Sequence, residues 1–196
     1  QIHAFFAGLD VTKGEFVCPL DPDDRYAETF LEDMVAAHLN PVRAVPLVSC
    51  EQMLLRGQEV ISGVVTGQPA TVLANAPAPG VNLSDSLRYF PASFGAWHWS
   101  STSGMMFRRP VLKAMRPHRL LGYKGDLDAW IAPGAHMLGG SMFLMKALIY
   151  RGIHDSNDWL RSDFWSRSQP PKSPHRADRV RADVREAIIA NGHERD

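Results

Sequence analysis

The stretch that most constrains the fold is GEFVCPLDPDD, from Gly14 to Asp24, in which a short apolar segment ends in a cluster of carboxylates. Its pattern predicts a buried strand over 16–20 that reaches the surface at an acidic tip. Side chains alternate between the two faces of an extended segment, so Asp21 and Asp23 are expected on the same face. The chain therefore presents a pair of carboxylates just beyond the end of a strand.

A pair of carboxylates in this position suits a hard divalent cation. Mg²⁺ is usually bound by one or two carboxylates, and water and substrate phosphates complete its coordination shell. The alternative is an ordinary surface turn, because Asp side chains bond to their own backbone and Pro presets φ. The residue types alone leave both interpretations of Asp21-Pro22-Asp23-Asp24 open.

Composition limits the functional classes. A chain of 196 residues with 45% hydrophobic and 21% charged residues suits one globular domain with at most an appendage. A formal net charge of zero gives no reason to expect binding to nucleic acid. No apolar run approaches the roughly 20 residues that a membrane-spanning helix needs. The two cysteines, Cys18 and Cys50, lack metal-type spacing and predict reduced, buried thiols in a cytoplasmic protein.

The hydrophobic pattern predicts a mixed α/β chain. Helices are expected over 2–9, 27–40, 111–115, 125–138, 157–167 and 177–190. Strands are expected over 16–20, 44–49, 52–55, 59–65, 105–107, 141–145 and 147–150, with a hairpin across Arg56-Gly57-Gln58. The segment 68–82 is predicted to be an irregular loop, and 169–174 a Pro-rich linker.

Four short blocks follow one another over most of residues 4–157. They are Ala7-Gly8-Leu9 with the acidic stretch, Thr102 to Arg109, Gly125-Asp126-Leu127-Asp128-Ala129-Trp130, and Tyr150-Arg151 with His154 and Asn157. Their order resembles family 2 of the inverting nucleotide-sugar glycosyltransferases. The resemblance implies a GT-A-like mixed sheet flanked by helices, with a partial catalytic domain over 1–168. The linker and an amphipathic helix would occupy 169–196, and that helix could pack on its own domain or on a partner.

The resemblance also implies roles for individual residues. Asp21 and Asp23 would hold Mg²⁺ or Mn²⁺ against the diphosphate of a UDP- or GDP-sugar, within a donor-binding set of Asp21, Asp23, Asp24 and Arg25. Asp126 aligns with the general base that deprotonates the acceptor hydroxyl, and Asp128 would help to orient that acceptor. The acceptor would be a saccharide, a lipid-linked or another hydroxyl compound. The alternative role of Asp126 is a helix N-cap.

Several other residues have two interpretations. Trp97, His98 and Trp99 could line a sugar-acceptor site, because aromatic faces pack on sugars, or they could belong to the core. The pair Arg108-Arg109 could bind phosphate, or it could be a solvated or helix-leading pair. His154 fits a phosphate or metal contact through the resemblance, and its alternative is a loop histidine. His136 is expected to be a packed histidine.

The sequence also departs from the family pattern. Phe5-Phe6 stand where the family has Arg-Asn, Gly125 stands where it has Glu, and one extra residue separates Arg151 from His154. The N-terminal nucleotide-binding half has no counterpart, so we expect an N-terminally incomplete chain, cytoplasmic and in one option peripheral to the inner membrane. Two alternatives stay open. One is a non-catalytic binding or structural module with a degenerate GT-A fold, and the other is an unrelated metal-dependent phosphotransferase or phosphohydrolase that uses Asp21 and Asp23.

Overall fold

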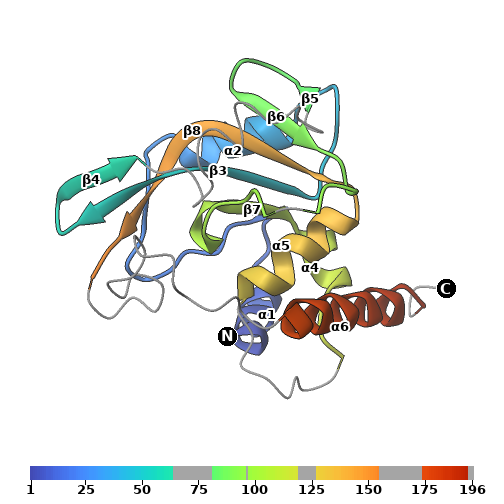
Figure 1. The fold of residues 1–196 in the computed structure, drawn as a ribbon. Coiled ribbons are helices and arrows are strands. Elements are labelled where there is room, and N and C mark those ends of the chain that lie inside the picture. Colours follow the sequence, from blue (N-terminus) through green and yellow to red (C-terminus); the bar gives the residue numbers. More distant parts are fainter. Residues whose placement is uncertain (64–80, 96, 119–126, 155–173, 194–196) are drawn as a thin grey trace.

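A computed structural model describes residues 1–63, 81–95, 97–118, 127–154 and 174–193 (Figure 1). Its helices are α1 (Ile2–Val11), α2 (Phe30–His38), α4 (Arg109–Ala114), α5 (Leu127–Met137) and α6 (Pro174–His193), with a 3₁₀ turn η1 (Thr102–Gly104). Its strands are β1 (Phe16–Val17), β2 (Arg25–Tyr26), β3 (Leu47–Arg56), β4 (Glu59–Gly63), β5 (Val81–Asn82), β6 (Leu87–Phe90), β7 (Met105–Arg108) and β8 (Ser141–Gly152).

The strands form one mixed sheet. Its order is β1-β7-β3-β8-β6-β5, with β2 paired to β8 and β4 paired to β3. The long central strands β3 and β8 run parallel, whereas β7 pairs with β3, and β6 with β8, in the antiparallel sense. Helix α2 covers one face, and α1, α4, α5 and α6 gather on the other (Figure 1). The predicted α/β class with a sheet flanked by helices is confirmed.

Alternation along the strands divides the core into two apolar clusters. In β3, Val48 and Cys50 face α2, where they pack with Phe30 and Met34. The intervening Leu47 points to the other face and packs with residues of α4, α5 and α6. The first four residues of β3 and of β8 are buried in succession, as is typical of strands covered on both faces.

Two predicted pairs of short strands prove to be single long strands. The segments 44–49 and 52–55 join in β3, and 141–145 and 147–150 join in β8. The register of the β3–β8 pairing shifts between Cys50 and Gln52. The side chains therefore alternate between the two faces of the sheet separately before and after this shift. The hairpin is confirmed, with Arg56 opposite Glu59 and Gly57 at a φ of 65° in the left-handed region.

The first strand is shorter than predicted. β1 ends at Val17, where 16–20 was expected, and Pro19 has no N–H for a ladder. Residues 81–82 of the predicted loop form β5. The rest of that loop to residue 80, the helix predicted over 157–167 and most of the linker lie outside the described residues.

The C-terminal helix packs on its own domain. Val180, Val184 and Ala187 of α6 are buried in the cluster that also contains Trp130 and Ile131 of α5. The side-chain amide of Asn191 donates to the carbonyl of Ala114, the last residue of α4, and to that of Arg116 just beyond it. The open choice between its own domain and a partner is therefore decided by apolar burial. Within the described residues, no helix is both long and apolar enough to cross a membrane.

Buried histidine makes stability depend on pH. His38 is 1% exposed, and its Nε2–H donates to the carbonyl of Met106 at 3.0 Å. Burial and the nearby Arg108 lower the pKa of His38 to about 4 from its ordinary 6.5. The unfolded chain takes up this proton below pH 6.5 and the folded chain does not, so His38 costs stability as the pH falls from 6.5 towards 4.

We expect the stability difference between the wild type and His38→Gln to shrink by about 2 kcal/mol between pH 7.5 and pH 5, at about 1.4 kcal/mol per pH unit. Denaturant unfolding of both proteins at the two pH values measures it. The comparison with a variant is needed because burial raises the pKa of Glu51 to about 7, which shifts wild-type stability in the opposite direction. A difference that is constant with pH would contradict the assignment to His38.

Candidate functional site

The acidic stretch forms a hydrogen-bonded turn between η1 and the C-terminal end of β8. After β1 the chain leaves the sheet, and the Asp24 N–H donates to the Asp21 carbonyl at 3.1 Å. The hydroxyl of Tyr26 donates to the carbonyl of Pro19 at 2.8 Å, and β2 then pairs antiparallel with β8. The turn interpretation is therefore confirmed, and the turn is also what presents the carboxylates at the surface.

Asp24 lies inside this turn and is only 7% exposed. Its carboxylate accepts the Gly152 N–H at 3.1 Å. Burial raises the pKa of Asp24, and the nearby Ser103 hydroxyl and the Gly152 N–H oppose that rise. A β-carbon on Gly152 would overlap the backbone carbonyl of Asp23, so the end of β8 can approach the turn only as glycine. Asp24 thus faces the protein rather than the solvent.

Asp21 and Asp23 are the surface members of the cluster. The Asp21 N–H donates to Ser103 Oγ at 3.0 Å, which fixes the backbone just before the carboxylate. Asp23 Oδ2 lies 3.1 Å from His154 Nε2. Partial burial raises the pKa of Asp21 most, and the nearby negative charges of Asp24 and Asp23 raise it further. The turn therefore concentrates negative charge at one point of the surface.

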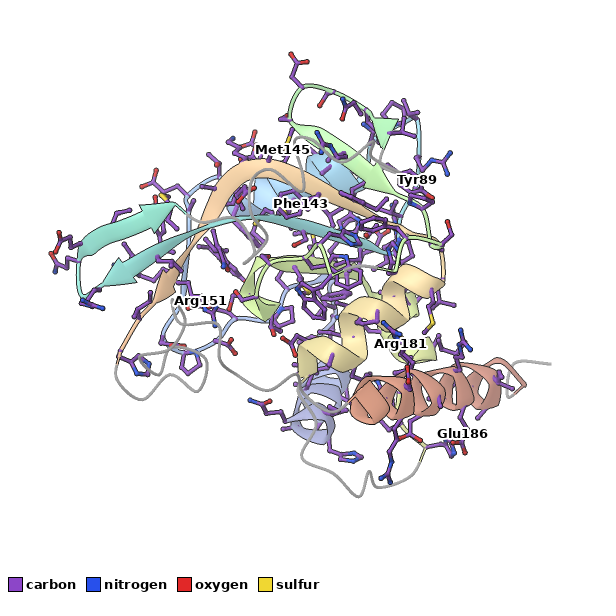
Figure 2. The ribbon with its side chains drawn as sticks, viewed as in Figure 1. Tyr89, Phe143, Met145, Arg151, Arg181 and Glu186 are labelled. Atoms are coloured by element: carbon purple, nitrogen blue, oxygen red, sulfur yellow. The ribbon has the colours of Figure 1, made fainter. Side chains whose placement is uncertain are left out.

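Arg151 supplies the opposing positive charge. It lies at the C-terminal end of β8 (Figure 2), and its charge lowers the pKa of both Asp21 and Asp24. His154 follows three residues later and contacts Asp23. The described part of the final sequence block, Tyr150 to His154, thus lies beside the acidic stretch, because β2 and β8 pair through Arg25 and Tyr150. Arg25 itself is exposed on this short edge strand.

The surface carboxylates fit a hard divalent cation in their chemistry. Carboxylate oxygens are preferred ligands of Mg²⁺ and Mn²⁺, and such ions commonly keep several waters. The part of the chain that the structure describes contains no group of three or more His, Cys, Asp or Glu that could hold a metal by itself. A cation at Asp21 and Asp23 would therefore need water or phosphate oxygens to complete its shell.

The predicted base region comes close to this turn. Asp128 lies in the first turn of α5, where its carboxylate accepts the Ala129 N–H at 2.7 Å. Negative charge is favoured at this end of a helix. Asp128 is near enough to Asp21 for its charge to raise the pKa of that residue. Asp126 lies outside the described residues.

The aromatic triplet is placed elsewhere. His98 is 1% and Trp99 4% exposed, and both hydrogen-bond to Ser141 Oγ, at 2.8 and 3.0 Å. Trp97 is half-buried, packs edge-on against Trp99 and donates its indole N–H to the Trp99 carbonyl. The structure does not bring these side chains to the acidic turn. The burial of His98 and Trp99 fits the interpretation that they belong to the core. A role of the triplet in binding a sugar acceptor stays a prediction.

His136 completes the polar network around Ser141. Its Nε2 lies 3.1 Å from the Phe94 carbonyl and therefore carries the proton, while its Nδ1 lies 2.9 Å from Ser141 Oγ. The serine can then donate to His136 and accept from both His98 and Trp99, which satisfies every group. Burial lowers the pKa of His136, as this neutral arrangement requires. The expectation of a packed histidine is confirmed.

Arg108 and Arg109 donate hydrogen bonds to the C-terminal ends of two helices. Arg108 donates to the carbonyls of His38, at the end of α2, and Val45. Arg109 donates to the Leu9 carbonyl at 2.9 Å and to Thr12 Oγ1 at 2.8 Å, at the end of α1. The last carbonyls of a helix lack partners within it, and cationic donors there are stabilising. The structure thus gives both guanidinium groups protein partners at helix ends.

Sequence reasoning missed two residues of the site. Ser103 lies within the block Thr102 to Arg109 but is given no role in the sequence analysis, and Gly152 is not singled out there. The available signal was weak: a serine within a block that resembles the family, and a glycine next to Arg151. Both roles depend on hydrogen bonds between residues that are 82 and 128 positions apart in the sequence.

Comparison with known proteins supports the class of fold. No protein-family model matches the chain. Over 174 residues it is 27% identical to an uncharacterized glycosyltransferase of Nostoc sp. (strain PCC 7120), which covers 88% of this chain and 50% of the relative. The chain therefore spans about half the length of this curated relative.

Solved structures lead to the same class. The crystal structure of Staphylococcus aureus TarS 1–349 in complex with UDP-GlcNAc matches 90% of this chain and 44% of that chain, with a TM-score of 0.56 and 14% identity. The same TarS region in complex with UDP matches 76% of this chain and 39% of that chain, with a TM-score of 0.51 and 14% identity. The described sheet and helices thus have a GT-A glycosyltransferase-like fold.

Proposed function

We propose that this chain is part of a glycosyltransferase that moves a sugar from a nucleotide-sugar donor to an acceptor hydroxyl with inversion. The observation that carries the proposal is that Asp128, in the first turn of α5, is near enough to the acidic turn for its charge to raise the pKa of Asp21. The likeness to a Nostoc glycosyltransferase and to the TarS fold supports the same class.

The surface carboxylates would serve donor binding. Asp21 and Asp23 would hold Mg²⁺ or Mn²⁺, and the bound cation would act as a Lewis acid that neutralises charge on the leaving nucleoside diphosphate. Arg151 provides a fixed positive charge at the same point, suited to a phosphate oxygen. Donor binding would therefore require both the carboxylates and an oxygen-rich ligand to complete the shell.

The α5 region would serve the acceptor. The resemblance assigns the general base to Asp126, which would take the proton from the acceptor hydroxyl as that oxygen attacks the anomeric carbon. Asp128 would orient the acceptor from the first helical turn. A carboxylate is a competent base only within hydrogen-bond distance of the proton it removes. The nearness of Asp128 to Asp21 is consistent with donor and acceptor meeting between these two segments.

Calorimetric titration of this chain with UDP and with GDP, first with Mn²⁺ and then with EDTA, tests the proposal. We expect binding of one of the two nucleotides that needs the metal and is lost with EDTA. The preferred nucleotide would identify the donor class. Absence of binding both to this chain and to a longer form with upstream residues would contradict the donor site and favour the non-catalytic module. Release of phosphate from a simple ester would instead favour a phosphohydrolase.

A further inference from the structure

The acidic turn contains a third carboxylate that the proposed chemistry does not use. Asp24 is 7% exposed, whereas its neighbours Asp21 and Asp23 lie at the surface. A buried carboxylate is costly unless hydrogen bonds compensate its lost hydration. Asp24 has a hydrogen bond from Gly152 and a nearby hydroxyl from Ser103, which belong to different parts of the fold.

The first bond joins the turn to the end of β8. Asp24 Oδ1 accepts the Gly152 N–H at 3.1 Å, across 128 residues of sequence. Gly152 lies directly after Arg151, and the lack of a β-carbon allows the Asp23 carbonyl to pack against it. The bond therefore sets the position of β8 and Arg151 relative to the acidic turn.

A second contact joins the turn to η1. Ser103 is fully buried, and its hydroxyl lies near enough to the Asp24 carboxylate to lower the pKa of that group. The same oxygen accepts the Asp21 N–H at 3.0 Å. A serine hydroxyl can donate once and accept twice, so both contacts are compatible. One buried oxygen thus links the backbone of Asp21 to the side chain of Asp24.

We propose that Asp24 and Ser103 are positioning residues that lock the turn, so that Asp21 and Asp23 are held as a preformed pair without Asp24 contacting the ligand. This inference rests on the proposed function for its ligand, a divalent cation with a nucleoside diphosphate. Residues behind metal ligands commonly act in this way, by fixing the orientation of the ligands they support. We call the Asp24–Ser103–Gly152 contact the turn lock.

The variants are chosen to separate position from charge. Ser103→Ala removes the bridging oxygen, and Asp24→Ala removes the side chain. Asp24→Asn keeps the shape: its carbonyl oxygen can accept the Gly152 N–H, and its amide can donate to Ser103. The matched control is Ser49→Ala, because Ser49 is equally buried, accepts the Ser100 N–H at 2.9 Å and contacts the Ser100 hydroxyl at 2.9 Å.

Two measurements are made on each variant. Amide hydrogen exchange at Asp21 and Gly152 reports the turn lock directly, and Mn²⁺ affinity with UDP, from calorimetry, reports the carboxylate pair. Ser103→Ala and Asp24→Ala should speed exchange at these amides and weaken Mn²⁺ binding about 10–100-fold, the range for residues behind metal ligands. Asp24→Asn should keep slow exchange and most of the affinity, and Ser49→Ala should change neither.

The outcomes distinguish the two proposals. Unchanged exchange in Ser103→Ala, or an Asp24→Asn protein that loses as much affinity as Asp24→Ala, would overturn the turn lock. The second result would mean that Asp24 acts through its charge. If neither this chain nor a longer form with upstream residues bound UDP or GDP with Mn²⁺, the proposed function would fail. Hydrogen exchange at the two amides would still test the turn lock. Faster exchange in Ser103→Ala would support it, and unchanged exchange would overturn it.

Discussion

Asp23→Ala is expected to lower Mn²⁺-dependent nucleotide affinity by more than about 100-fold, because even residues behind metal ligands cost 10–100-fold. Asp23 is one of two surface carboxylates in the turn, and the described residues contain no group of three or more His, Cys, Asp or Glu that could hold a metal by itself. A single remaining carboxylate would leave the cation held mainly by water and phosphate. Calorimetric titration of UDP with Mn²⁺ measures the loss.

The matched control removes one charge elsewhere. Asp178 is an exposed residue of α6 that lies 3.7 Å from Arg181 in the next turn of the helix. Asp178→Ala changes the net charge equally but should leave nucleotide affinity within error, since exposed pairs of this kind contribute little. Equal losses in Asp23→Ala and Asp178→Ala would contradict a specific role for the acidic turn. Retained affinity in Asp23→Ala would remove it from the proposed donor site.

Gly152→Ala is expected to destabilise the protein by about 1–3 kcal/mol, the usual cost of forcing an extra carbon into a closely packed place. The new β-carbon would overlap the Asp23 carbonyl, which is backbone and cannot rotate away. Either β8 or the acidic turn must move, and the bond from the Gly152 N–H to Asp24 would weaken. Denaturant unfolding measures the stability, and the Mn²⁺–UDP titration should show a parallel loss of affinity.

Gly8→Ala is the control for adding a methyl group. Gly8 lies within α1, and nothing lies within 4 Å of the place where its β-carbon would be. Alanine is favoured over glycine in a helix interior by up to about 1 kcal/mol, so this variant should be slightly more stable than the wild type. If Gly152→Ala were as stable as the wild type, the close approach of β8 to the turn would not be a constraint on folding.

Local periodicity made much of the fold predictable. The helices over 30–38, 109–114 and 174–193 and the hairpin around Gly57 coincide with predicted elements, because each is defined by contacts close in sequence. The strand pairing was not predictable in the same way. Nothing local indicates that β3 lies between β7 and β8, or that the split segments of β8 form one strand.

The candidate site likewise has features that the local sequence predicts and features that only tertiary packing decides. The sequence by itself determined that Asp21 and Asp23 follow a short strand at an acidic turn, since alternation and turn chemistry are local properties. Tertiary structure alone decided that Asp24 is buried, that the Gly152 N–H binds it, that Ser103 binds the Asp21 N–H, and that the charge of Asp128 is near enough to raise the pKa of Asp21. It also placed His98 and Trp99 in the core. The reason is physical: burial and charge proximity depend on which distant segments pack together, and strand pairing across the whole sheet sets that packing.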